Sequence, residues 1–307
     1  MHRVLLIRIS SPDRTLPGKG GPSSAGKPST ADNRPGFGFF GPVAVAVLLA
    51  ATAFSSAVLA EDAVDRADNF VVRGTSAPRA AAIVGHAERL RSEAFERLLD
   101  EDSPPRWTVR CVIHVHASVD SFIDSVGGAP EAARGATSLQ FAGDRVVSRR
   151  IDVMGDGPDI VPDALAHELV HVVLADHFVH AAPPRWADEG LALLFDAPEK
   201  QREHEIDFRD AMRRGLAWPA AELLTLEDYP ADSPRQRVFY GQSAALVRWL
   251  IARRTAATFI RFVDDSHAIG VGPSLRRHYD LDSAAALHLA WKETAPIHSL
   301  SLVERSR

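Results

Sequence analysis

The chain has 307 residues, of which 46% are hydrophobic and 24% are charged, and these fractions exclude a disordered or collagen-like protein. The net charge of −5 and the isoelectric point of about 6.2 provide no strong positive field, so no nucleic-acid partner is expected. The single cysteine, Cys111, excludes a disulfide within the chain and any metal or iron–sulfur site made of several cysteines.

The first 60 residues have the composition of a leader. Residues 1–41 carry six Lys or Arg against two Asp, and the Pro, Gly, Ser and Lys content of 11–36 predicts disorder in this leader. The uncharged run 43–60 follows and ends in small side chains, which predicts a signal peptide cleaved after Ala60. Alternatively, 37–60 stays attached as a membrane anchor, because its 24 residues are long enough to span a bilayer. Both interpretations predict an exported protein, secreted or membrane-tethered. A buried core helix is a third and weaker interpretation of the same run.

The rest of the chain is predicted to place strands before helices. We expect a linker at 61–77, one domain at 78–295 and a tail at 296–307. Hydrophobic periodicity predicts a helix at 78–100, a strand at 107–116, a helix at 119–126, two strands around Gly143 and Asp144, and helices near 160–177, 184–196, 199–214, 240–252, 255–264 and 283–293. This order predicts an α+β fold, with a small sheet followed by a mostly helical part.

The chemistry is concentrated in the segment His167-Glu168-Leu169-Val170-His171. Two histidines at positions i and i+4 lie one above the other on a helix, so their imidazole nitrogens can share one tetrahedral metal ion. Glu168 lies on the same side, where it can take a proton from a metal-bound water. Five residues of this pattern also arise by chance, and the alternative is a pair of buried structural histidines beside a solvated glutamate.

A second acidic motif follows on the next predicted helix. Asp188 and Glu189 interrupt the apolar stretch 183–195, and a carboxylate that points into a core is costly unless it is paired or binds a metal. Gly190 has no side chain, so another helix can pack closely at this point. Glu189 is therefore the candidate third ligand, which leaves one open position for water. The alternative is a solvated first helical turn that suits the helix dipole.

Together these two motifs resemble those of the gluzincin metallopeptidases, in particular the bacterial proteins called peptidase MA-like. The resemblance rests on His167-Glu168-x-x-His171 and Trp186-x-x-Glu189-Gly190-x-Ala192, and it covers roughly 107–255. It implies a thermolysin-like catalytic core, a bound Zn²⁺ and hydrolysis of peptide bonds. It also implies that His167, His171 and Glu189 are the zinc ligands and that Glu168 is the general base.

The pattern departs from the family at one supporting position. Some gluzincins carry an acidic residue four positions after the glutamate ligand, where it orients the first histidine, but this chain has Leu193 there. Asp196 lies on the same helix face and is a candidate for that role, and Asp188 is a candidate partner of His171. No Gly-x-Met-Glu-Asn motif marks an aminopeptidase.

Other polar residues carry weaker hypotheses. Tyr240 is the candidate donor to the oxyanion, because families of this shape often carry a tyrosine at the start of such a helix; the alternative is an ordinary interfacial tyrosine. His204 is a weaker rival that we expect on a solvated face. His114 and His116 are expected to be solvated or packed on the sheet, and Cys111 to be buried and unreactive. Finally, Arg149 and Arg150 are expected to protect a sheet edge or to mark a strand to which a substrate adds its own strand.

The sequence therefore predicts an exported zinc metallopeptidase that acts on a peptide or protein substrate. The alternative is a zinc-stabilised binding module that shares the fold and has no catalytic activity. Glu168 favours the enzyme, because metal ligands alone would serve stability. A deformylase-like amidase is a third and weaker interpretation, since such enzymes use a cysteine ligand and Cys111 is on the wrong face of its predicted strand.

Overall fold

The computed structural model describes residues 2–9, 65–127, 133–230 and 232–298. The predicted signal peptide or anchor at 37–60 lies outside these residues. Among the helices of the described ranges, none is both long and apolar enough to cross a membrane.

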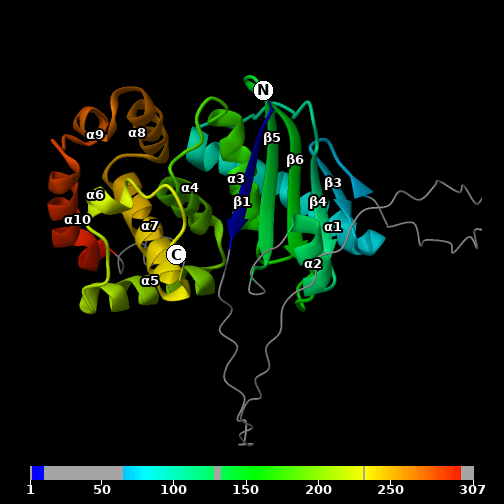
Figure 1. Ribbon diagram of the computed structural model, residues 1–307. Helices are drawn as coiled ribbons and strands as arrows, with labels where there is room; N and C mark the ends of the chain where they lie inside the picture. The colour runs from blue at the N-terminus through cyan, green and yellow to red at the C-terminus, as the bar shows by residue number, and fades with distance from the viewer. Residues whose placement is uncertain (1, 10–64, 128–132, 231, 299–307) are drawn as a thin grey trace, which may run out of the picture. The chain divides into compact units, whose positions relative to one another are not determined.

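A six-stranded sheet with strand order β1-β5-β6-β4-β3-β2 forms one part of the fold (Figure 1). β3, β4 and β6 run parallel to one another, whereas β1, β5 and β2 are each antiparallel to the neighbour with which they pair. β5 and β6 form a hairpin, and Gly143 takes the left-handed conformation in its turn, with φ of 62°. The strands are β1 (His2–Ile9), β2 (Asp65–Arg66), β3 (Phe70–Arg73), β4 (Cys111–His116), β5 (Gly135–Ala142) and β6 (Arg145–Met154).

The two faces of the sheet are covered by different helices, because successive side chains of a strand point to opposite faces. Ile151 and Val153 belong to a core cluster shared with α1 and α3, whereas Met154 belongs to a separate cluster with Phe122 of α2. The helices on the sheet are α1 (Ala77–Ala94), which continues as a π-helical turn at Phe95–Leu99, α2 (Val119–Val126) and α3 (Leu165–His177).

The second part of the fold is helical and has a core of its own. In Figure 1 the sheet lies to one side and α5 to α10 to the other, with α4 between them. Trp186, Phe239 and Phe259 are among the buried side chains of this core. The helices are α4 (Arg185–Ala192), a 3₁₀ turn at Leu193–Phe195, α5 (Pro198–Arg213), α6 (Ala220–Leu223), α7 (Ser233–Arg253), α8 (Ala256–Ile269), α9 (Val271–Tyr279) and α10 (Ala284–His298). The predicted α+β fold class is confirmed: a sheet is followed by a mostly helical part.

The structure differs from the expected boundaries in several places. Residues 2–9 form strand β1, although the sequence places them in a disordered leader, and the expected linker at 61–77 contributes strands β2 and β3. The helix expected at 240–252 begins at Ser233, because Asp232 caps it by accepting a hydrogen bond from the amide of Arg235. The short helices α6 and α9 were not expected.

Candidate functional site

Helix α3 carries both histidines of the motif and is buried on almost every side. The exposed fraction is 1% for His167, Glu168 and His171, and the apolar residues between them are fully buried. A helix that is hydrophobic all round is typical of a core helix. The polar side chains of the motif therefore face other protein groups instead of solvent.

Helix α4 brings Glu189 to the same point, and Gly190 explains the close packing of this helix. A Cβ at Gly190 would lie 2.4 Å from Val247 Cγ2 and 2.8 Å from the backbone oxygen of Ser243, both on α7. Only a glycine lets α7 approach this closely. Glu189 is completely buried and Asp188 is 4% exposed, so the alternative of a solvated helical turn is wrong.

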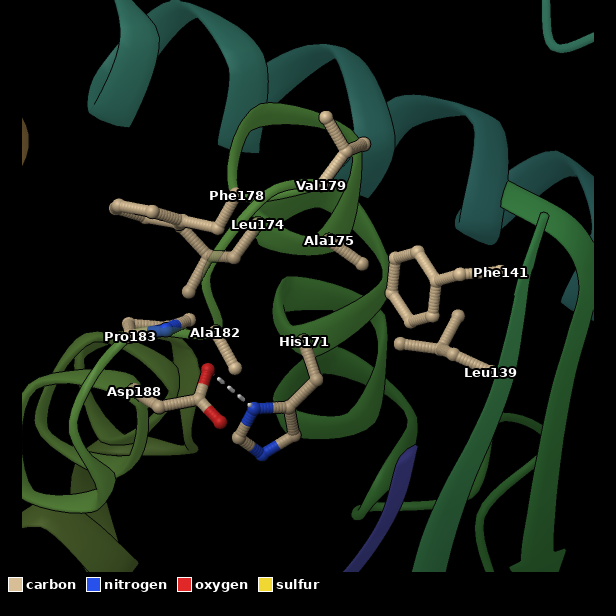
Figure 2. Close-up of a pocket in the computed structure, with 10 residues that line it drawn as sticks. All are labelled: Leu139, Phe141, His171, Leu174, Ala175, Phe178, Val179, Ala182, Pro183 and Asp188. Carbon is tan, nitrogen blue, oxygen red and sulfur yellow. Dashed lines mark ion pairs between the residues drawn. The ribbon is translucent and has the colours of Figure 1, made fainter. Parts of the chain in front are cut away.

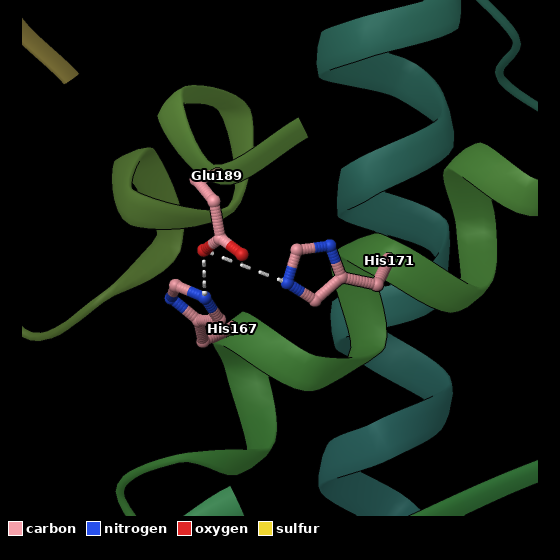
Figure 3. Close-up of side chains that lie close together, drawn as sticks. All are labelled: His167, His171 and Glu189. Atoms are coloured by element: carbon pink, nitrogen blue, oxygen red, sulfur yellow. Dashed lines mark hydrogen bonds and ion pairs between the residues drawn. The ribbon is translucent and has the colours of Figure 1, made fainter. Parts of the chain in front are cut away.

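His167, His171 and Glu189 converge on one point (Figure 3). Their ligand atoms all lie within 4.8 Å of one another. Glu189 Oε2 is 3.3 Å from His167 Nε2 and 4.0 Å from His171 Nε2. Two imidazole nitrogens and one carboxylate oxygen form a donor set that suits zinc. This buried group of side chains can hold a metal ion.

Two aspartates stand behind the histidines, on the side away from Glu189. Asp196 Oδ1 is 3.2 Å from His167 Nδ1, and Asp188 Oδ1 is 3.0 Å from His171 Nδ1. When Nδ1 donates its proton to a carboxylate, the lone pair of Nε2 is free to bind a metal. Neither nitrogen of His171 makes a hydrogen bond in the described part of the chain, but Nδ1 is within ion-pair distance of Asp188 and Nε2 faces Glu189. The contacts expected of Asp196 and Asp188 are therefore present.

The carboxylates control the charge of this group. Burial by itself lowers the pKa of His167, but Asp196 and Glu189 outweigh it and raise that pKa to about 10. Burial likewise opposes ionisation of Asp196, yet His167 and Lys200 lower its pKa to about 2. Lys200 Nζ is 3.1 Å from Asp196 Oδ2 and so neutralises part of the negative charge. Asp196 therefore stays ionised although it is buried.

Glu168 is held by strand β5 instead of by the histidines. Thr137 Oγ1 is 2.7 Å from Glu168 Oε2 and 3.0 Å from the backbone oxygen of Glu168. Gly135 leaves room for the carboxylate, since a Cβ there would lie 2.5 Å from Glu168 Oε1. Burial raises the pKa of Glu168 to about 7, and a pKa near neutrality suits a group that exchanges protons.

Sequence reasoning missed Thr137 and Lys200, and it also missed Tyr229. Its hydroxyl donates a hydrogen bond to Glu189 Oε1. The guanidinium of Arg185 lies over the Tyr229 ring, 5.2 Å from the ring centroid. Burial raises the pKa of Tyr229 well above its usual value, so the hydroxyl keeps its proton. Tyr229 lies in the loop between α6 and α7, where neither periodicity nor a motif distinguishes it.

The ring of Tyr240 lies beside that of Tyr229, and His204 lies beside Tyr240. Tyr240 is buried within α7, and its ring centroid is 6.2 Å from that of Tyr229 and 6.1 Å from that of His204. His204 is 7% exposed, and burial lowers its pKa to about 4, so the expected solvated face is wrong. It is buried because Gly241 lets α5 approach α7 closely.

An apolar pocket adjoins His171 and Asp188 (Figure 2). Leu139 and Phe141 of β5 line one side of it, and Leu174, Phe178 and Pro183 line the other. The group that can hold a metal therefore borders a small apolar space.

The remaining candidate residues lie apart from the metal-binding group. His116 is buried on the α2 side of the sheet, and its Nε2 is 2.7 Å from Asp152 Oδ1, so it serves the packing of the sheet. Cys111 is completely buried, and burial raises its thiol pKa, as expected of an unreactive cysteine. The edge predicted at Arg149 and Arg150 is wrong, because β6 lies between β5 and β4. Arg149 is buried against Asp176 and the ring of Trp107.

Comparison of the chain with models of known protein families and with curated proteins found no match.

Proposed function

We propose that this protein is an exported zinc metallopeptidase of the gluzincin type that hydrolyses peptide bonds. The observation that carries the proposal is the combination of three convergent ligand atoms with a carboxylate, Glu168, that is not one of them. His167, His171 and Glu189 are the proposed ligands of zinc.

Each side chain of the site has a distinct role in this proposal. Zinc, when bound, would supply Lewis acidity towards a water molecule and the substrate carbonyl. Glu168 takes a proton from the attacking water and delivers it to the leaving amine, and Thr137 holds the Glu168 carboxylate in position. Asp196 and Asp188 orient the two imidazole rings. Tyr229 fixes Glu189 through its hydroxyl, and Tyr240 remains a candidate donor to the developing oxyanion.

A zinc-stabilised binding module is the second candidate, and the burial of the site favours it. Structural zinc sites are closed, whereas catalytic ones keep a position open to solvent. All three proposed ligands and Glu168 are at most 1% exposed in the structure. The two candidates differ in what Glu168 does, because a structural site has no use for a buried carboxylate that binds no metal.

Zinc content and peptide cleavage test the proposal together. We expect about one zinc per chain after zinc loading, and cleavage of a peptide library by the wild type. Glu168→Gln keeps the size of the side chain but cannot take the proton, so this variant should retain zinc and lose cleavage. Glu203→Gln, on the exposed face of α5, is the matched control. Absence of zinc would refute the proposal, and cleavage by Glu168→Gln at the wild-type rate would refute the role of the base.

A further inference from the structure

A cavity of about 170 Å³ lies in the helical part of the fold, apart from the metal-binding group. Its walls come from α5, α7 and α10 and from the loop between α5 and α6. In Figure 1 these helices lie together on the side away from the sheet, where α10 packs against α6 and α7. None of the described residues that line the cavity belongs to the group that can hold a metal, so the proposed function gives it no role.

Three aromatic side chains form much of the cavity wall. The rings of Phe208 on α5 and Trp291 on α10 are stacked, with their centroids 5.4 Å apart and their planes 2° apart. Trp218, in the loop between α5 and α6, is the third. The three residues are 3–8% exposed, so the surrounding helices hold their rings in place. The ring of a ligand can pack against such walls by offset stacking or edge to face.

The size of the cavity fits one ring. An apolar protein cavity of roughly 150 Å³ is large enough to bind benzene, so about 170 Å³ accommodates a six-membered ring with a short substituent. Gly215 lines the cavity, and a Cβ built there would have no other atom within 4 Å. Space is therefore open beside Gly215, and a ligand can enter on this side.

The buried polar side chain of the wall is already paired. Gln242, on α7, is completely buried. Its side-chain oxygen accepts a hydrogen bond from the amide of Trp218 at 2.9 Å, and its side-chain nitrogen donates one to the carbonyl of Trp218 at 2.7 Å. Gln242 thus fixes the position of Trp218, and a ligand has to find its polar partners elsewhere.

Two donors on α10 can supply those partners. His288 and Lys292 both line the cavity and are one helical turn apart, so they share a face of the helix. His288 Nδ1 accepts a hydrogen bond from the amide of Ala220 at 3.3 Å, so the proton of the neutral ring is on Nε2. Lys292 is exposed and has no ion-pair partner within the described ranges of the chain. An ammonium and an N–H donor beside aromatic walls suit a ligand that is both aromatic and anionic.

We propose that this cavity binds a short aromatic carboxylic acid, either free in solution or as the C-terminal residue of a peptide. The ring packs against Phe208, Trp218 and Trp291, and the carboxylate meets Lys292 and His288 at the rim. The charge favours the acid over a neutral ring of the same size, because hydrogen bonds between ionised groups are about twice as strong as neutral ones. The proposal depends neither on zinc nor on peptidase activity.

NMR titrations of the full-length protein with three small probes test the proposal. The first probe is 3-phenylpropionate; 3-phenylpropanamide keeps the ring without the charge, and hexanoate keeps the charge without the ring. We expect 3-phenylpropionate to bind with a Kd on the order of 0.1–1 mM, the range for about eleven non-hydrogen atoms. The other two probes should bind at least about fivefold more weakly. Absence of binding by 3-phenylpropionate, or equal binding by either of the other two, would overturn the proposal.

Two variants locate the binding. Lys292→Gln changes an exposed side chain and should weaken binding of 3-phenylpropionate at least about fivefold, without changing the affinity for the amide. Arg261→Gln is the matched control, because it removes an exposed cation of α8, a helix that does not line the cavity. Ala217→Phe places a ring inside the cavity and should abolish binding, and its melting temperature reports whether it folds. Wild-type affinity in Lys292→Gln, or in a folded Ala217→Phe, would overturn the proposal.

A tripeptide distinguishes the two sources of the ligand. If alanyl-alanyl-phenylalanine binds as tightly as 3-phenylpropionate and its C-terminal amide does not, the cavity takes the end of a peptide. If only 3-phenylpropionate binds, the cavity takes a free acid, and both results support the site. The titrations use protein without added zinc and without turnover, so their failure is distinguishable from failure of the proposed peptidase.

Discussion

Asp196 Oδ1 lies 3.2 Å from Nδ1 of His167 and thereby fixes which nitrogen of that imidazole can bind a metal. The aspartate is in the loop after α4 and the histidine is in α3, so the contact joins the two elements that carry the proposed ligands. Removing the carboxylate leaves the ring without a fixed orientation and tautomer.

Asp196→Asn should therefore weaken zinc binding by about 10–100-fold, and Asp188→Asn should act similarly through His171. Competition with a chromophoric chelator measures the affinity. Asp282→Asn is the matched control, because Asp282 pairs with Arg276 at the exposed surface. If Asp196→Asn binds zinc as tightly as this control does, His167 is not oriented by Asp196 or is not a ligand.

Tyr229→Phe should lower activity, because the Tyr229 hydroxyl donates a hydrogen bond to Glu189, one of the proposed ligands. If Tyr240 donates to the oxyanion, Tyr240→Phe should lower kcat and kcat/KM together by about 10²–10³-fold at unchanged KM. Steady-state kinetics of both variants decide between the tyrosines. A normal kcat and normal zinc affinity in Tyr229→Phe would show that Glu189 keeps its position without this hydroxyl.

Gly190→Ala should destabilise the protein by about 1–3 kcal/mol and weaken zinc binding, because the added methyl group pushes α4 away from α7. Gly85→Ala is the matched control within a helix. A Cβ at Gly85 has its nearest neighbour, Arg89 Nη1, at 3.7 Å, so that variant should be neutral or stabilised by up to about 1 kcal/mol. Urea unfolding provides both free energies. If Gly190→Ala is as stable as Gly85→Ala, α7 can move away from the added methyl group without a loss of stability.

Ionisation of Asp152 should make the free energy of unfolding depend on pH in the acidic range. Burial opposes its ionisation, but hydrogen bonds from His116, Arg150 and Ser125 lower its pKa to about 2. Since the pKa is lower in the folded state, this carboxylate stabilises the fold above the unfolded pKa of about 4 and loses that contribution as the pH falls through about 2.

Asp152→Asn should therefore lower the free energy of unfolding by about 1–3 kcal/mol at neutral pH, since it leaves buried donors unpaired. The difference from the wild type should shrink between about pH 4 and pH 2. Urea unfolding at a series of pH values measures it, and a difference independent of pH would show that the carboxylate charge contributes nothing.

Much of the candidate site could be predicted because its spacing is local. His167 and His171 are one helical turn apart, and Glu189 belongs to the next helix, so periodicity places these three residues on definite faces. The sequence places Asp196 on that same helix, but it lies in extended backbone after the 3₁₀ turn Leu193–Phe195, so only the fold brings it to His167. Val119–Val126 was expected from its pattern and from Gly127, which ends the helix with φ of 72°.

Contacts between distant segments could not be predicted in this way. Tyr229 reaches Glu189 from a loop 40 residues further along the chain, and no local pattern marks it. His204 lies on a helix with a charged composition, yet it is buried because Gly241 lets another helix cover it. The order of the strands also had to come from the fold, since hydrogen bonding between strands has no fixed separation in sequence.

The sequence by itself determined the fold class, the helix that carries the paired histidines and the identity of the residues that can bind a metal. Those features follow from short-range periodicity and from the cost of burying a carboxylate without a partner. Only the tertiary structure decided that Thr137 holds Glu168, that Tyr229 holds Glu189 and that residues 2–9 pair with the edge of β5. These relationships join segments that are far apart in the chain: β5 packs against α3, α4 packs against α7, and β1 pairs with β5.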